Sequence, residues 1–307
     1  MEKDPSLVDR ARPGSLKPAP ALGIAPLCAI NASPAEYLAA GAAAGFDFVG
    51  IRISPVTQAD PVYSPDGPEF RHLLKLVADS GLEVLDTEVF RVTADSSPDV
   101  WNPILDMSAR LGAKLINVVG VDDDLSRLTD RIGRFTEDSK GFGITPVLEP
   151  IAYVALNSYS TAIDIAIAVG CEVELDALHA LRTGLNPQLV ADNSKLFPIF
   201  QLCDAPAEMV RWGDNRPPGT SPDDNDMIIE SRYNRLTPGQ GDAPLVELLA
   251  SLAPGTPIAM EIPNIDLQSQ HTVHEYIELM HREAVQFLHL ATDHSAQIVG
   301  WKAEELR

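Results

Sequence analysis

Cysteines and long apolar runs are both scarce in this chain. Its three cysteines, Cys28, Cys171 and Cys203, lie far apart in apolar segments, which excludes a disulfide framework or a cysteine-rich zinc site and predicts buried free thiols. Proline, glycine or charged residues interrupt each apolar stretch before the roughly 18 residues that a membrane span needs. The N-terminus also has no apolar signal core. We therefore expect a soluble, cytoplasmic protein with no membrane partner.

Positive charge is scarce as well. Lysine and arginine number 23 against 44 aspartates and glutamates, so the formal net charge is −21 at pH 7. Because nucleic-acid affinity depends on basic side chains that neutralise phosphates, this balance argues against a DNA or RNA partner. It does not exclude a small anionic substrate, since a metal ion and one or two arginines can reverse the local potential.

The 307 residues, 45% of them hydrophobic, are enough for one large core, and α/β barrels commonly fill this length as a single domain. Residues 1–20 mix charge with Pro13, Pro18 and Pro20 and show no apolar periodicity. We therefore expect a flexible N-terminal tail over residues 1–20, followed by a single TIM-barrel domain over residues 21–307.

Short β-rich runs alternate with helical segments, a pattern that is typical of βαβ units and a parallel sheet. Ser33 and Pro34 predict a helix start and Gly45 its end, and apolar positions at helical spacing from Val273 to Ala291 predict a last helix packed on the barrel. There are eight expected strands: 22–27, 46–53, 83–89, 114–119, 145–149, 171–175, 199–203 and 257–262. This number closes a (β/α)8 or TIM barrel, the predicted α/β fold class. The alternative, a doubly wound open sheet, lacks its usual Gly-rich turn after the first strand.

Four consecutive predicted strands end in an oxygen-bearing side chain. These residues are Glu149, Asp176, Gln201 and Glu261. In a closed barrel, the residues at the C-terminal strand ends lie around one central site. Carboxylates that converge there without a cation would repel one another, and this repulsion would raise their pKa values. An all-oxygen set suits one divalent ion, Mn2+ or Mg2+, better than Zn2+, while Zn2+ and Co2+ stay open. The alternative is that each acid caps a helix or pairs with an arginine.

Several short motifs give the chain a family resemblance. They are Leu148-Glu149-Pro150, Asp176-Ala177-Leu178-His179, Phe200-Gln201-Leu202-Cys203-Asp204-Ala205-Pro206, Pro238-Gly239-Gln240-Gly241-Asp242 and Met260-Glu261. With them, the sequence resembles the sugar phosphate isomerase/epimerase superfamily of xylose isomerase-like barrels, from about Leu22 to past Asn264. The resemblance implies that Glu149, Asp176, Gln201 and Glu261 bind the metal and that His179 contacts the substrate. Gln201 departs from the histidine of many epimerases, and its motif is similar to the branch that contains 3-dehydroshikimate dehydratases.

The expected activity is that of a metal-dependent sugar, sugar phosphate or keto-polyol isomerase or epimerase. A metal-stabilised enediolate would carry the proton transfer, and the related ketose epimerases imply that Glu149 and Glu261 are the acid and base. His179 would bind a substrate hydroxyl or shuttle a proton. Loss of a β-hydroxyl at the same site would instead give a 3-dehydroshikimate dehydratase-like lyase, which is the alternative.

Two further side chains are candidates for substrate binding. Arg232, with Arg235 as the second choice, would hold an anionic group of a small sugar or cyclic keto-polyol. Glu88 would line the pocket or pair with Arg91. A non-catalytic barrel and an abasic-site endonuclease relative are the other function classes, but the acidic surface and the few strand-end histidines argue against the endonuclease. A homo-oligomer stays open, and the sequence assigns no role to Asp204 or to the loop at 214–226.

Overall fold

A computed structural model describes residues 20–55 and 61–295 of the chain. The predicted tail over residues 1–20 therefore lies, except for Pro20, outside the described residues. Within the described part, the three cysteines are buried and free, as predicted, and no helix is long and apolar enough to cross a membrane.

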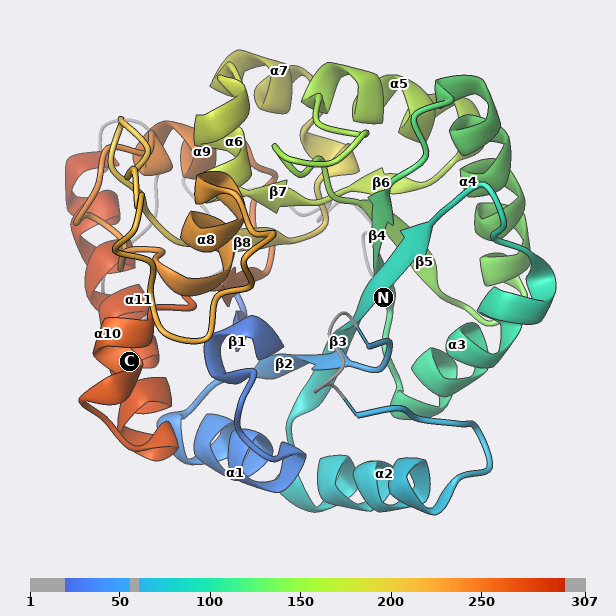
Figure 1. The fold of residues 1–307 in the computed structure, drawn as a ribbon, viewed down its shortest axis with the longest axis horizontal. Coiled ribbons are helices and arrows are strands. Elements are labelled where there is room, and N and C mark those ends of the chain that lie inside the picture. Colours follow the sequence, from blue (N-terminus) through green and yellow to red (C-terminus); the bar gives the residue numbers. More distant parts are fainter. Residues whose placement is uncertain (1–19, 56–60, 296–307) are drawn as a thin grey trace, which may run out of the picture.

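The strands form one nearly closed parallel sheet with helices around it (Figure 1). The described chain contributes nine strands, in the order β6-β5-β4-β3-β2-β1-β9-β8-β7. Their bounds are β1 Leu22–Ile24, β2 Phe48–Arg52, β3 Glu83–Val92, β4 Leu115–Gly120, β5 Thr145–Leu148, β6 Glu172–Val173, β7 Leu175–Asp176, β8 Phe200–Leu202 and β9 Ile258–Met260. The fold is α/β and TIM-barrel-like, and its strand order differs from that of an open doubly wound sheet.

The predicted eight-stranded closed sheet needs a correction at its sixth strand. The expected strand at 171–175 is split into β6 and β7, with Glu174 between them. The amide of Glu174 still donates to the Leu148 carbonyl of β5 (2.9 Å), whereas the amide of Leu175 already donates to Ile199 beside β8 (3.4 Å). The chain thus changes its bonding partner within one residue, and the two ends of the sheet meet here without a continuous ladder.

Helices follow the strands and cover the outside of the sheet (Figure 1). They are α1 Pro34–Ala44, α2 Pro68–Ser80, α3 Pro98–Leu111, α4 Leu125–Lys140, α5 Tyr159–Val169, α6 Ala177–Thr183, α7 Pro187–Asp192, α8 Asp226–Tyr233, α9 Leu245–Ser251, α10 Ile265–Ser269 and α11 Val273–Ser295, with short 3-10 helices η1 Pro26–Ala29 and η2 Ser194–Leu196. The predicted first helix is confirmed: Ser33 forms a capping box with Glu36, and Gly45 ends the helix at a φ of 91°.

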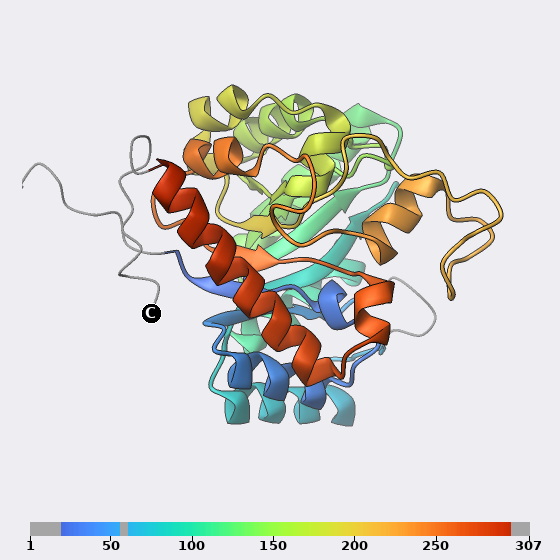
Figure 2. The same cartoon turned by 90° about the vertical axis from the view of Figure 1, so that its left-hand side faces the viewer.

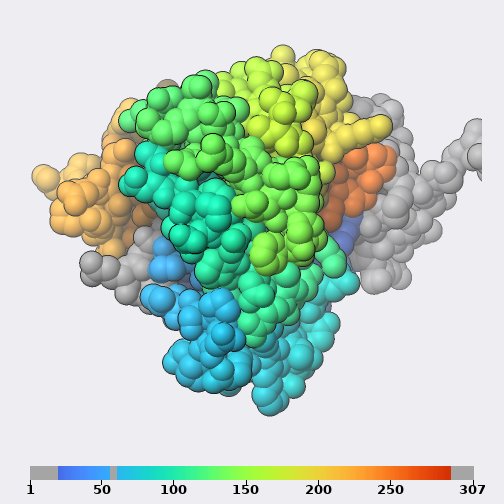
Figure 3. Space-filling model, turned by 90° about the vertical axis from the view of Figure 1, so that its right-hand side faces the viewer, coloured from blue at the N-terminus to red at the C-terminus, as the bar shows by residue number. Residues whose placement is uncertain are grey.

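The last helix, α11, lies across the outside of the barrel and packs beside α1 (Figure 2). Its residues Ile277, Met280, Ala284 and Leu288 are almost completely buried, which confirms the predicted apolar face. Seen from the side of α3 and α4, the side chains of the helices form a continuous outer wall (Figure 3). The orange segment that carries α8 extends beyond one end of the barrel in Figures 2 and 3.

A small apolar cluster separates from the main core and comes from five parts of the barrel. Its buried members are Phe48, Leu115, Val147, Ile199 and Ala259. Side chains in a strand alternate between the two faces, so the residue two positions later points to the same side. Two positions after four of these residues stand Asn117, Glu149, Gln201 and Glu261. The barrel interior therefore changes from an apolar layer to a polar layer toward the C-terminal strand ends.

Candidate metal and catalytic site

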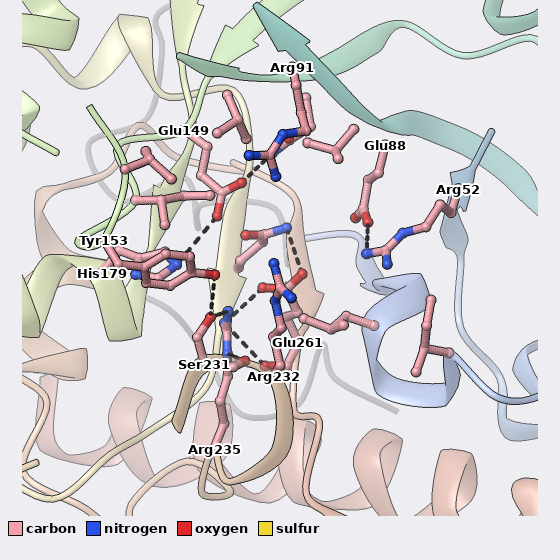
Figure 4. Close-up of a pocket in the computed structure, with 18 of the residues that line it drawn as sticks. Arg52, Glu88, Arg91, Glu149, Tyr153, His179, Ser231, Arg232, Arg235 and Glu261 are labelled. Atoms are coloured by element: carbon pink, nitrogen blue, oxygen red, sulfur yellow. Dashed lines mark hydrogen bonds and ion pairs between the residues drawn. The ribbon is translucent and has the colours of Figure 1, made fainter. Parts of the chain in front are cut away.

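The predicted site residues gather at the C-terminal end of the barrel. Glu149 and Glu261 directly follow β5 and β9, while Asp176 and Gln201 are paired residues of β7 and β8. All four are buried, with at most 7% of each residue exposed. Glu149, Gln201 and Glu261 line a pocket of about 130 Å³ (Figure 4), and the fully buried Asp176 lies beside it.

His179 joins this group through the first turn of α6. Asp176 is the N-cap of that helix, and its Oδ1 accepts a hydrogen bond of 2.7 Å from the His179 backbone amide. The His179 Nε2 atom lies 3.7 Å from Oε1 of Glu149. One candidate ligand atom from each of Glu149, Asp176 and His179 lies within 4.8 Å of the others. The group that could hold a metal thus contains a nitrogen donor, unlike the all-oxygen set expected from the sequence.

Arg235, named from the sequence only as the second choice for an anionic substrate group, instead pairs with two acids of the site. Its guanidinium Nη1 lies 2.7 Å from Oε2 of Glu261 (Figure 4) and 2.6 Å from Oδ2 of Asp176. The backbone oxygen of Ser231 accepts a 2.8 Å hydrogen bond from Arg235 Nε, and only 1% of Arg235 is exposed. Asp176 and Glu261 therefore both form an ion pair with the same buried arginine. The sequence expectation put Arg232 first; it also lines the pocket, half-buried at the end of α8.

The electrostatics follow from burial and from the crowding of acids. Burial, with the neighbouring Glu261 and Asp176 carboxylates, raises the pKa of Glu149 to about 8. Burial likewise raises the pKa of Glu261 to about 8 against the opposing effect of Arg235. Burial also acts to raise the pKa of Asp176, but Arg235 and His179 outweigh it and lower that pKa overall. Burial lowers the pKa of His179 to about 4, so its imidazole is neutral at pH 7.

The similarity of this chain to known proteins lies in its fold. No family model and no curated protein sequence matches the chain. Among solved structures, it is similar to a xylose isomerase-like TIM barrel/4-hydroxyphenylpyruvate dioxygenase fusion protein, with a TM-score of 0.73 and 21% identity over 92% of this chain. This chain spans only 45% of that longer protein. It has the xylose isomerase-like TIM-barrel fold.

Two other solved structures with this fold contain a ligand. The IOLI protein, solved with a binding zinc atom, has a TM-score of 0.67 and 16% identity, over 88% of this chain and 98% of that one. A D-allulose 3-epimerase from Methylomonas sp., solved in complex with D-allulose, has a TM-score of 0.60 and 13% identity, over 89% of this chain and 98% of that one. At such identities the similarity shows the fold alone.

The residues of this xylose isomerase-like barrel suit a divalent cation. Gln201 donates through Nε2 to Glu261 Oε1 (3.3 Å), but its own Oε1 is buried without a hydrogen-bond partner. The His179 Nε2 atom, 3.7 Å from Glu149 Oε1, adds a nitrogen atom beside it. Unpaired buried polar atoms cost about 1–3 kcal/mol each, and a cation would also relieve the repulsion that raises the pKa values of the two glutamates. The donor set therefore fits a metal ion.

Asn117 and Glu174 support Glu149 from the barrel interior. The Nδ2 group of Asn117 donates to Glu149 Oε2 at 2.8 Å and to Glu174 Oε2 at 2.5 Å. Burial raises the pKa of Glu174 well above its usual value, and only 1% of the residue is exposed. Neither residue was among the sequence-based candidates, although Asn117 stands two positions after Leu115, as Glu149 stands two after Val147. Asn117 fixes the orientation of the Glu149 carboxylate.

Glu88 lines the same pocket, but its partner differs from the expected one. Its Oε2 lies 3.3 Å from Nη2 of Arg52, the residue that it pairs with in the β2–β3 ladder. The expectation that Arg91 pairs with Glu88 is wrong: Arg91 is exposed and lines the pocket separately. Arg52 was absent from the sequence-based candidates because a lone arginine at a strand end carries no motif.

Asp204, to which the sequence assigned no role, organises a loop. Its carboxylate accepts hydrogen bonds from the backbone amides of Gly239 (2.9 Å), Gly241 (2.9 Å) and Ala243 (3.0 Å). A Cβ atom at Gly241 would lie 2.4 Å from the Ala205 carbonyl oxygen, so this close approach requires glycine. Asp204 thus has a structural role at the rim. In the loop at 214–226, Asp224 likewise accepts from the Ser221 amide (2.9 Å).

Proposed function

We propose that this protein is a divalent-metal-dependent isomerase or epimerase of a small keto sugar, sugar phosphate or cyclic keto-polyol. The observation that carries the proposal is the convergence of Glu149, Asp176 and His179 within 4.8 Å, beside a small pocket that Glu261 also lines. The zinc atom of the IOLI structure and the D-allulose complex of the epimerase support the same class of chemistry for this fold.

Glu149, Asp176, Gln201 and Glu261 would hold the ion, with Mn2+ or Mg2+ as the proposed metal and His179 as a neighbouring nitrogen donor. When bound, the ion supplies electron withdrawal that acidifies the C–H bond next to a substrate carbonyl. Arg235 contacts Asp176 and Glu261, which are two of the four proposed ligands. Its guanidinium must therefore either keep these contacts beside the ion or release them when the ion binds.

The protein's own residues would perform the proton transfer. Glu149 and Glu261 reach the pocket from β5 and β9, so one can remove a proton and the other can return it. The raised pKa values of about 8 suit this task, because a group that titrates near the working pH can both accept and donate. The neutral His179, 3.7 Å from Glu149, would bind a substrate hydroxyl.

A dehydratase acting on a carboxylated substrate such as 3-dehydroshikimate is the second candidate. Gln201 favours it, since this residue and its motif resemble the branch that contains these enzymes. Arg91 and Arg232 also favour it, because both line the pocket and neither has an ion-pair partner among the described residues. An arginine without a partner can hold a substrate carboxylate.

Solvent exchange tests both candidates in one experiment. Mn2+-loaded protein is incubated in D2O with ketoses, ketose phosphates, inosose and 3-dehydroshikimate. Deuterium uptake next to the carbonyl is the expected result for an isomerase or epimerase, and a new conjugated ultraviolet absorbance identifies the dehydratase. Glu149→Gln and Glu261→Gln should each lower the rate by about 10²–10⁴-fold. Equal rates in the wild type and these variants would overturn the two-glutamate proposal, and Asp106→Asn on the outer surface is the control.

A further inference from the structure

The pocket has a second polar end formed by Arg52 and Glu88. The sheet order places β2 and β3 across the barrel from β7, which carries Asp176. In Figure 4, Arg52 and Glu88 lie on one side of the pocket, and Glu149 and His179 lie on the other. A substrate whose carbonyl lies at the carboxylate group would therefore extend its remote end toward Arg52 and Glu88.

This pair is held by strands rather than by loops. Arg52 and Glu88 are adjacent partners in the parallel β2–β3 ladder, and the Glu88 carbonyl accepts hydrogen bonds from Ile53 (2.9 Å) and Ser54 (3.3 Å). Their side chains are 13% and 4% exposed. A site on a rigid sheet can discriminate between ligands more sharply than one on a loop.

Each member of the pair retains one unused polar atom. The Arg52 Nε donor and the Glu88 Oε1 acceptor are both buried without a hydrogen-bond partner, although a 3.3 Å ion pair joins the two side chains. Buried polar groups are nearly always hydrogen-bonded, so two exceptions on neighbouring residues that line a pocket indicate a ligand. The pair offers one donor and one acceptor, and its formal charges cancel.

We propose that Arg52 and Glu88 form a subsite that binds a neutral hydroxyl group at the substrate end remote from the carbonyl and excludes a phosphate or carboxylate there. A hydroxyl both donates and accepts, so it matches the unused donor and acceptor together. Burial raises the pKa of Glu88 to about 8 against the opposing effect of Arg52, so the compounds are compared at pH 8.5, where Glu88 is mainly ionised. A phosphate only accepts at this pH and would face the Glu88 carboxylate, because the ionised Glu88 neutralises Arg52. The orientation of the substrate in this inference rests on the proposed function.

Three matched compounds test the subsite: D-allulose, 6-deoxy-D-allulose and D-allulose 6-phosphate. Deuterium exchange with Mn2+ and equilibrium binding by calorimetry with and without Mn2+ are measured for each. The wild type should prefer D-allulose over both other compounds by at least about 100-fold, because a site built for a hydroxyl rejects an analogue that lacks it.

Two variants should move the phosphate result in opposite directions. Glu88→Gln removes the negative charge that cancels Arg52, so binding of the phosphate should tighten about 10-fold or more, while D-allulose weakens less. Arg52→Met removes the donor, so the preference over the deoxy compound should fall while the phosphate stays excluded. A folding defect would weaken all three compounds together. Asp106→Asn is the control, because it breaks a surface arginine–acid pair of 3.1 Å far from the pocket.

The outcomes separate the subsite from the proposed function. Exchange without discrimination among the three compounds, or Glu88→Gln that leaves phosphate excluded, overturns the subsite and leaves the isomerase proposal standing. Discrimination in binding, without exchange in these compounds or in the wider panel of ketoses, ketose phosphates and inosose, supports the subsite and overturns the isomerase proposal. If none of the three compounds binds and none undergoes exchange, both proposals are overturned.

Discussion

Arg182 and Arg235 both bind buried carboxylates, but their surroundings differ. Arg182 donates through Nε (2.7 Å) and Nη2 to Glu230, and the Pro206 and Ala207 carbonyls accept from its terminal nitrogens at 2.8 and 3.1 Å. This pairing joins α6, α8 and the segment after β8, and Glu230 has no access to the pocket. Arg235 instead contacts Asp176 and Glu261, which are also proposed metal ligands.

The difference separates a structural ion pair from one that is available for function. The donors of Arg182 are matched by a bidentate carboxylate and backbone carbonyls, so nothing else can replace it. The acids at Arg235 can be neutralised in another way, by a proton or by a metal ion. The following predictions test this contrast.

Arg182→Ala should have the largest effect on stability. It leaves the Glu230 carboxylate, a fully buried group, without its cation, which costs about 3–5 kcal/mol in the free energy of unfolding. Urea unfolding with and without Mn2+ measures this loss, which should be the same in both conditions. Recovery of part of the loss in the double variant Arg182→Ala/Glu230→Ala is expected; recovery on adding Mn2+ would contradict the structural role.

Arg235→Met should destabilise the metal-free protein by about 2–3 kcal/mol, less than the Arg182 change because Glu261 can take up a proton instead. Mn2+ should restore most of this loss and bind the variant more tightly than the wild type, since a neighbouring cation is removed. Thermal unfolding and calorimetric titration with Mn2+ measure both effects. Weaker Mn2+ binding in the variant would show that Arg235 supports the metal site instead of competing with it.

The stability of the metal-free protein should fall by about 2 kcal/mol per pH unit between pH 6.5 and 8. Glu149 and Glu261, with pKa values raised to about 8 by burial, keep protons in the folded state that the unfolded chain has already lost above about pH 4.5. Below pH 6.5, His179 opposes this trend, because its lowered pKa makes the unfolded chain bind the extra proton. Thermal unfolding across this range measures the slope. Glu149→Gln or saturating Mn2+ should flatten it, and an unchanged slope in both would contradict the assignment.

Asp106→Asn should have the smallest effect, below about 0.5 kcal/mol, because exposed ion pairs contribute little. The Arg110–Asp106 pair of 3.1 Å is 35% and 43% exposed. Salt titration of the unfolding transition checks it: 0.5 M NaCl should remove any difference from the wild type. A loss comparable to that of Arg182→Ala would remove the distinction between buried and surface pairs.

Much of the fold could be predicted from the sequence. Seven of the eight expected strands correspond to single strands, and the helix at Ser33–Gly45 ends as its capping residues predict. The strand ends also led to Glu149, Asp176, Gln201 and Glu261. The predictions of the fold depend on local signals: period-two alternation, helix caps, and the rule that parallel strands end at one edge.

The structural features that the sequence did not predict share a different cause. The division between β6 and β7 depends on which neighbour each amide finds at the closing point of the sheet. The pairing of Glu88 with Arg52 instead of Arg91 depends on the register of two strands. Neither the strand division nor the ion pair can be predicted from the pattern of residues along the chain.

The sequence by itself determined the alternating β and α segments, the acidic balance, and the oxygen-bearing side chains at the ends of four consecutive strands. Only the tertiary structure decided that Arg235, 59 positions after Asp176, occupies the space between that residue and Glu261. The physical reason is range: backbone hydrogen bonds and hydrophobic periodicity act between near neighbours, whereas the partner of a buried charge is chosen by the packing of segments that are distant in the chain.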